Sequence, residues 1–170
     1  MDANEGALVK GASLFFGPSF IEVHAETGGH TSMLDRAAFH AYLPPDASTL
    51  EIARLVQQAL DASYHWDMEL FAARGGWRGM TPRWNDWVQE MHQRFPAKKS
   101  KSALFKGLRW LLIKRRENVL TLFPKNRVRG DGYGFLPGEN KQTLSLVFHL
   151  DDPAFDWSDA LRQGMAHCKG

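Results

Sequence analysis

The sequence has one cysteine and no long apolar run, and both absences limit where the protein can work. Cys168 is the third residue from the C-terminal end. Without a second cysteine an intramolecular disulfide is impossible, which is typical of a reducing compartment. No segment approaches the roughly 20 apolar residues that cross a bilayer. Asp2 and Glu5 precede every apolar run, unlike in a secretion signal. We therefore expect a cytoplasmic protein that is neither secreted nor inserted in a membrane.

The motifs of common catalytic sites are also missing. The sequence contains no Gly-x4-Gly-Lys-Ser/Thr loop for phosphates and no Gly-x-Ser-x-Gly turn for a nucleophilic serine. Cys168 is a poor nucleophile if, as we expect, the C-terminal tail frays. The seven histidines never occur at the i, i+4 spacing that places two metal ligands on one helix face. The sequence therefore supports no enzymatic activity, no cofactor and no metal site.

Length and strand-like patterns indicate the fold class. A chain of 170 residues with 44% hydrophobic content fits one domain, residues 1–170. Alternating or apolar runs predict strands at 13–16 and 20–24, and a hairpin from 110–113 and 119–123. The nearly continuous apolar run 144–150 predicts an interior strand buried on both faces. With helices between and after the strands, we expect an α+β domain, mainly an antiparallel sheet packed with amphipathic helices.

Capping residues predict three amphipathic helices. Ser48 and Glu51 have the spacing of a capping box, which begins a helix that runs to about Tyr64. Thr81-Pro82 begins a second helix that ends before Pro96, and Asp156 caps a third that runs to about His167. The inward faces are Ile52, Leu55, Val56, Ala59 and Leu60, then Trp84, Trp87, Val88, Met91 and Phe95, then Trp157, Ala160, Leu161 and Met165. The paired tryptophans are interpreted as core anchors, with a ligand-stacking surface as the alternative.

Charge is strongly segregated along a chain whose net charge is only +2. Residues 1–93 hold 6 Lys/Arg and 12 Asp/Glu, residues 94–129 hold 12 and 1, and residues 130–170 hold 3 and 6. The balances are therefore −6, +11 and −3. One interpretation of the basic segment is that its cations keep a β-ribbon soluble at its tip, 114–118. The alternative is that it neutralises nucleic-acid phosphates, with these residues in contact: Lys98, Lys99, Lys101, Lys114, Arg115 and Arg116.

Four segments of the chain carry a family pattern. Residues 98–108 read KKSKSALFKGL, and the hairpin after them ends Thr121-Leu122-Phe123-Pro124. The other two are 17–23 and 55–63. Together they resemble immunity proteins of bacterial contact-dependent growth-inhibition systems, in which 17–23 is similar to the first strands and 55–63 to the end of the first long helix.

This resemblance implies a non-catalytic cytoplasmic inhibitor. Such a protein neutralises the toxic C-terminal domain that a neighbouring cell delivers, commonly a nuclease, by blocking its active site or substrate groove. Carboxylates would complement the cationic groove of a nuclease and speed encounter. The candidate toxin contacts are Asp151, Asp152, Asp156 and Asp159, with a second group of Glu22, Glu26 and Asp35. For Asp156 the alternative role is that of a helix cap.

Overall fold

The computed structural model describes residues 9–27, 33–34, 38–64, 68–73, 80–96, 100–127, 133–135 and 143–170. Within them the chain forms eight strands and five helices. In chain order these are β1 (Lys10–Phe16), β2 (Ile21–Thr27), β3 (Met33–Leu34), β4 (His40–Leu43), α1 (Thr49–Ala62), α2 (Met68–Ala73), α3 (Met80–Arg94), α4 (Lys101–Leu104), β5 (Arg109–Arg116), β6 (Val119–Arg127), β7 (Tyr133–Phe135), β8 (Leu146–His149) and α5 (Trp157–His167).

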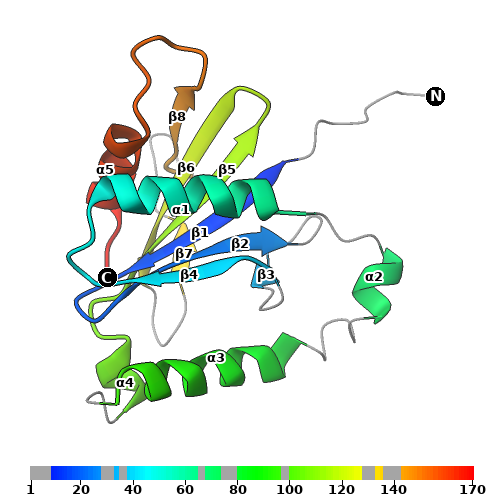
Figure 1. Cartoon of the computed structure of the whole chain (residues 1–170), viewed down its shortest axis with the longest axis vertical. Coiled ribbons are helices and arrows are strands. Elements are labelled where there is room, and N and C mark those ends of the chain that lie inside the picture. The colour runs from blue at the N-terminus through cyan, green and yellow to red at the C-terminus, as the bar shows by residue number, and fades with distance from the viewer. Residues whose placement is uncertain are drawn as a thin grey trace.

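The strands form one antiparallel sheet with helices on both faces, which confirms the predicted α+β class. The strand order is β3-β2-β1-β5-β6-β7, with β4 also paired to β2 and β8 also paired to β6. Helices α1 and α5 pack on one face, and α3 and α4 lie on the other side of the strands (Figure 1). Side chains alternate between faces along each strand, so each helix pair meets its own set of side chains.

Helix α1 begins with the predicted capping box. The Glu51 backbone N–H donates to Ser48 Oγ over 3.3 Å, and the Ser48 backbone N–H donates to Glu51 Oε2 over 2.9 Å. The bonds that Ser48 donates to the Glu51 carboxylate lower its pKa. The helix buries four of the five predicted residues against the apolar side of β1 and β2: Ile52, Val56, Ala59 and Leu60. Ala53 is buried with them, whereas the predicted Leu55 is only partly buried. The first core is therefore built between α1, α5 and the sheet.

Two strand predictions need correction. The segment 144–150 was expected to be an interior strand, but β8 pairs with β6 alone among the described strands, and the Val147 side chain is 54% exposed. Leu146 and Phe148 face the core, while Val147 and His149 face outward. The predicted hairpin tip 114–118 is also too long, because β5 continues through Arg116.

The turns and helix starts shift by a few residues. The turn between β5 and β6 consists of Glu117 and Asn118 alone, with Glu117 in the left-handed region at φ 51°. Helix α3 begins at Met80, so Thr81 and Pro82 lie in its first turn and not just before it. Differences of one or two residues at helix ends are ordinary.

The C-terminal tail is ordered, which makes the prediction of a frayed end wrong. Cys168 is 5% exposed and belongs to the first core, where its Sγ donates to the Trp110 carbonyl over 3.2 Å. The Lys169 backbone N–H donates to the Lys125 carbonyl over 3.1 Å, so the tail lies beside β6. Burial raises the pKa of the Cys168 thiol to about 11. The tail therefore packs beside β6.

The second face of the sheet carries a buried polar network. Ser13 Oγ donates to Glu26 and accepts a hydrogen bond from Trp110 Nε1 over 2.9 Å. His24 Nε2 lies 3.4 Å from Glu26 Oε1, and both side chains are buried. Lys125, only 4% exposed, places its ammonium 4.9 Å from the centre of the Trp110 ring. Most of these polar groups therefore pair with one another, while His24 Nδ1 is buried without a hydrogen-bond partner among the described residues.

The pKa values of Glu26 and Lys125 are both shifted by burial and by their neighbours in this network. Burial alone would raise the pKa of Glu26, but the hydrogen bonds with His24 and Ser13 and the attraction of His24 outweigh burial and lower it. Burial lowers the pKa of Lys125 to about 8, against the attraction of Glu26, which raises it. The folded state therefore favours the ionised form of Glu26 and disfavours the protonated form of Lys125.

We predict that Cys168 is protected from alkylation. A buried thiol with a raised pKa forms little thiolate, and thiolate is the reactive species. At pH 8, iodoacetamide should modify the native chain at least about tenfold more slowly than the urea-unfolded chain, measured by mass spectrometry over time. Equal rates in the two states would show that the tail is exposed.

Glu26 should contribute to stability in a pH-dependent way. Its folded-state pKa lies below the usual 4.5, so its contribution is complete above that value and disappears as the pH falls through the folded-state pKa. Glu26→Gln should lower the free energy of unfolding by about 1–3 kcal/mol at pH 7, and the difference from the unmodified chain should shrink below about pH 4. Urea unfolding at several pH values measures both effects. Glu69→Gln, which changes an exposed carboxylate on α2, is the control, and identical pH profiles for the three proteins would contradict the assignment.

Candidate binding site

An acidic pocket lies where β8 leads into α5. Its cavity of about 190 Å³ is lined by β8, the following turn and the first residues of α5. Asp152, Asp156 and Asp159 are among the lining residues, so the fold brings together three of the four aspartates predicted as a group. Asp151 precedes them in the same turn and is exposed, but it does not line the cavity.

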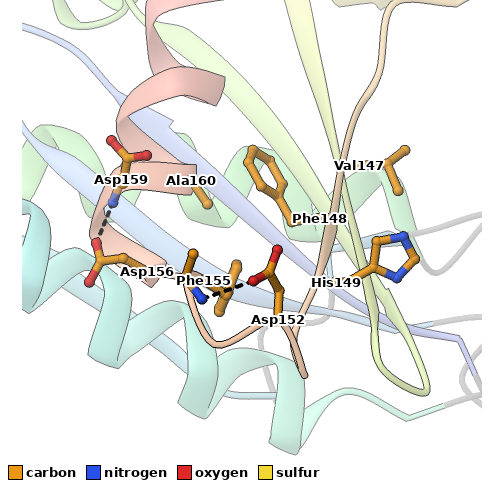
Figure 2. A pocket seen from close by; sticks show the side chains of 9 residues that line it. Val147, Phe148, His149, Asp152, Phe155, Asp156, Asp159 and Ala160 are labelled. Atoms are coloured by element: carbon orange, nitrogen blue, oxygen red, sulfur yellow. Dashed lines mark hydrogen bonds between the residues drawn. The ribbon is translucent and has the colours of Figure 1, made fainter.

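Local hydrogen bonds position the three carboxylates, and Figure 2 shows those of Asp152 and Asp156. Asp152 Oδ1 accepts from the Ala154 backbone N–H over 2.9 Å, and Asp156 Oδ1 accepts from the Asp159 backbone N–H over 2.7 Å. Asp156 is therefore the N-cap of α5, which confirms its alternative role as a cap. Arg162 and Gln163 donate to Asp159 over 2.5 and 2.8 Å. The carboxylates are thus held in place by their own segment of chain.

The pocket combines an acidic rim with apolar side chains. Phe148 and Phe155 line it with Ala160, and their rings lie 6.3 Å apart between centroids. The exposed ion pair between Arg162 and Asp159 contributes little to stability. The N-terminal end of α5 favours negative charge nearby. Carboxylates beside apolar surface fit the side chain of lysine or arginine, which has an apolar stem and a cationic head. The pocket can therefore accept a cationic side chain from a partner.

The second predicted acidic group is not a surface patch. Glu22 and Glu26 are 1% and 6% exposed, respectively, on the second face of β2. Glu26 belongs to the polar network described above, and Glu22 accepts from Trp87 Nε1. Asp35 lies outside the described residues. The two glutamates therefore act inside the protein, and among the described residues only the aspartates after β8 remain as candidate contacts.

The residues named for nucleic-acid binding do not form one surface in the described part of the chain. Lys98 and Lys99 lie outside the described residues, and Lys101 is on α4, before β5 begins. Lys114 and Arg115 are consecutive on β5 and therefore point to opposite faces. Arg115 donates to Asp61 of α1 over 2.6 Å, so it pairs with an acidic side chain of its own protein. Arg116 is exposed at the end of β5.

Sequence reasoning missed the apolar part of the pocket. Phe148 was assigned to an interior strand and Phe155 was not considered. The alternation of polar Ser145 and His149 with apolar neighbours is the signal of a half-buried strand, and it indicates that one face of β8 is exposed. The position of Phe155 against β8 depends on the fold of the turn, for which the sequence offers no comparable signal.

A second cavity, of about 410 Å³, is lined by Lys10, Arg115, Glu117, Asn118 and Leu150. None of the helices among the described residues is both long and apolar enough to span a membrane. Among the same residues, no three His, Cys, Asp or Glu side chains gather in a way that would hold a metal ion.

Comparison with known proteins identifies the family. The family model described as CDI immunity protein, CdiI, matches residues 10–168. Immunity protein CdiI-YPIII of Yersinia pseudotuberculosis serotype O:3 is 24% identical over 176 residues, covering 94% of this chain and 95% of that protein.

Two solved structures share the fold over nearly the whole chain. One belongs to a CdiA-CT/CdiI toxin and immunity complex from Yersinia pseudotuberculosis, with a TM-score of 0.80, 21% identity and coverage of 97% of this chain and 100% of that one. The other is a protein of unknown function from Neisseria meningitidis, with a TM-score of 0.82, 18% identity and 99% coverage of both chains. Because the family model spans nearly the whole chain, this protein belongs to the CdiI family of contact-dependent growth-inhibition immunity proteins.

Proposed function

We propose that this chain is a cytoplasmic immunity protein that binds the C-terminal toxin domain of a contact-dependent growth-inhibition effector. It neutralises that domain, a nuclease in this proposal, by covering its active site or substrate groove, without catalysis of its own. The family membership and a structural relative found in a toxin and immunity complex support this function. The observation that carries the choice of surface is the acidic pocket between β8 and α5.

Charge complementarity gives the physical reason. A nuclease holds nucleic-acid phosphates with clustered lysine and arginine side chains. Asp151, Asp152, Asp156 and Asp159 present carboxylates on one short segment, beside the apolar wall of the pocket. Such a surface attracts the cationic groove at long range and accepts one of its side chains at contact. An inhibitor bound there blocks the phosphate path, so no chemistry is needed.

Protection in cells is the first test. The proposal requires an upstream neighbouring gene for a large secreted protein with a variable C-terminal domain. Expression of that domain alone should stop growth, and coexpression of this chain should restore it, as measured by viable counts. Loss of intact nucleic acid in the unprotected cells would show that the toxin is a nuclease. If coexpression leaves the cells unprotected, the proposed function is wrong.

The second test concerns the acidic pocket. Asp152→Asn with Asp159→Asn should lower the association rate with the purified toxin domain by about tenfold at low ionic strength, because electrostatic steering weakens. The difference should fade as salt is added, since the charges are then screened. Stopped-flow fluorescence measures these rates.

A matched control removes the same charge from other elements. Glu69→Gln on α2 with Asp86→Asn on α3 changes two exposed carboxylates outside the pocket. This control should associate at the unmodified rate. If both double variants slow association equally, net charge governs the encounter and the pocket is not the contact surface.

A further inference from the structure

The second cavity, of about 410 Å³, lies where β1 begins and where the turn between β5 and β6 meets the end of β8. Lys10 and Arg115 line it with Glu117 and Asn118 of the turn and with Leu150, which follows β8. The Leu150 backbone N–H donates to the Asn118 carbonyl over 2.8 Å, which fixes this wall to the turn. Glu117, the carboxylate of the lining, is exposed. Two cations face one carboxylate, so we call this space the cationic cavity.

The strand register places the cationic cavity and the acidic pocket in one row of the sheet. Lys10 lies opposite Arg115, and Arg115 lies opposite Leu120. Leu120 in turn lies opposite Phe148, which lines the acidic pocket. Residues directly opposite one another share a face of the sheet. Because neighbouring strands are about 4.8 Å apart, the Cα atoms of Arg115 and Lys10 lie roughly 10 and 14 Å from that of Phe148.

The two cations of the cavity share one residue of α1. Arg115 Nη2 donates to Asp61 Oδ1 over 2.6 Å, and Lys10 Nζ donates to the Asp61 carbonyl over 3.0 Å. A carbonyl has no formal charge, so Lys10 forms no ion pair within the described part of the chain. Like charges directly opposite on paired strands repel one another. The positive charge of Lys10 and Arg115 is therefore only partly neutralised by the protein itself.

A partner that covers the acidic pocket also covers the cationic cavity. A stable interface buries about 800 Å² on each partner, a patch roughly 30 Å across, and the two sites fit within half of that width. Such a cover removes the water that solvates Lys10 and Arg115, and a desolvated cation is destabilised unless an opposite charge faces it. A uniformly cationic partner surface is repelled there, whereas an acidic side chain forms an ion pair.

We propose that the toxin domain presents an acidic side chain to the cationic cavity while a cationic side chain of the same domain occupies the acidic pocket. The two toxin charges lie roughly 10–15 Å apart, to match the spacing of the two sites. This inference rests on the toxin-binding function proposed above, and it adds the second charge that the partner carries. The pair of opposite charges also fixes orientation, because a partner that is turned around brings like charges together.

The sign of the effect of one substitution tests this proposal. Lys10→Gln removes a charge from the cavity and leaves the ion pair of Arg115 with Asp61 in place. It should raise the dissociation constant of the complex with the purified toxin domain at least about fivefold, mainly through faster dissociation. A cationic toxin surface at this point predicts the opposite, since the loss of Lys10 then relieves repulsion. Surface plasmon resonance measures the constant, and a tighter or unchanged complex overturns the proposal.

Two matched variants separate the cavity from net charge. Lys106→Gln, between α4 and β5, removes the same charge from an exposed position outside both cavities, and it should bind like the unmodified chain. Lys10→Arg keeps the charge in the cavity and should bind within about twofold of the unmodified chain. If Lys106→Gln weakens the complex as much as Lys10→Gln does, net charge is responsible and the proposal is wrong.

Chemical crosslinking locates the acidic toxin residue. A carbodiimide joins an amine directly to a carboxylate in contact with it, so Lys10 should become linked to an aspartate or glutamate of the toxin domain, identified by mass spectrometry. A complex that forms but yields no such link at Lys10 contradicts this inference and leaves the proposed function standing. If the unmodified chain forms no complex with the toxin domain, the proposed function itself fails, and this inference fails with it.

Discussion

The pairing of β1 between β2 and β5 is the constraint on which the rest of the structure depends. Its register places Leu14 opposite Val23 on one side and opposite Leu111 on the other, so three apolar side chains meet α1 and α5. The same register sends Ser13 and Phe15 to the opposite face. A shift by one residue would exchange the two sets. The apolar core and the polar network therefore both follow from one alignment.

The two faces of the sheet are stabilised by different kinds of interaction. Under α1 and α5 the sheet buries apolar side chains only, and stability there comes from removing apolar surface from water. On the other face, Glu22 and Glu26 are buried with His24 between them, and donors from Trp87 and Ser13 complete their environment. Such a face gives less free energy per contact and more geometric specificity. The acidic pocket lies apart from this network, after β8, where Asp152 and Asp156 are exposed at the surface.

Local rules account for what was predicted well. Ser48 with Glu51 and Asp156 with Asp159 are bonds between residues three apart, so their spacing alone predicts a helix start. The predictions that failed concern long-range contacts. Cys168 seemed to lie in a free tail, because only the fold places it against the Trp110 carbonyl, 58 residues away. The exposure of Val147 likewise depends on which face of β8 is covered, because Leu146 and Phe148 turn toward the first core and Val147 turns away from it.

The sequence by itself determined the fold class, the main helices with the caps of α1 and α5, and a resemblance to the family that the whole-chain comparison confirms. These follow from periodicity and from interactions within a few residues, which do not need tertiary contacts to be recognised. Only the tertiary structure decided that the carboxylates of Glu22 and Glu26 are internal while those after β8 stay at the surface. The reason is that a charge pattern along the chain says nothing about which segments pack against one another. Burial is a property of packing between segments far apart in sequence.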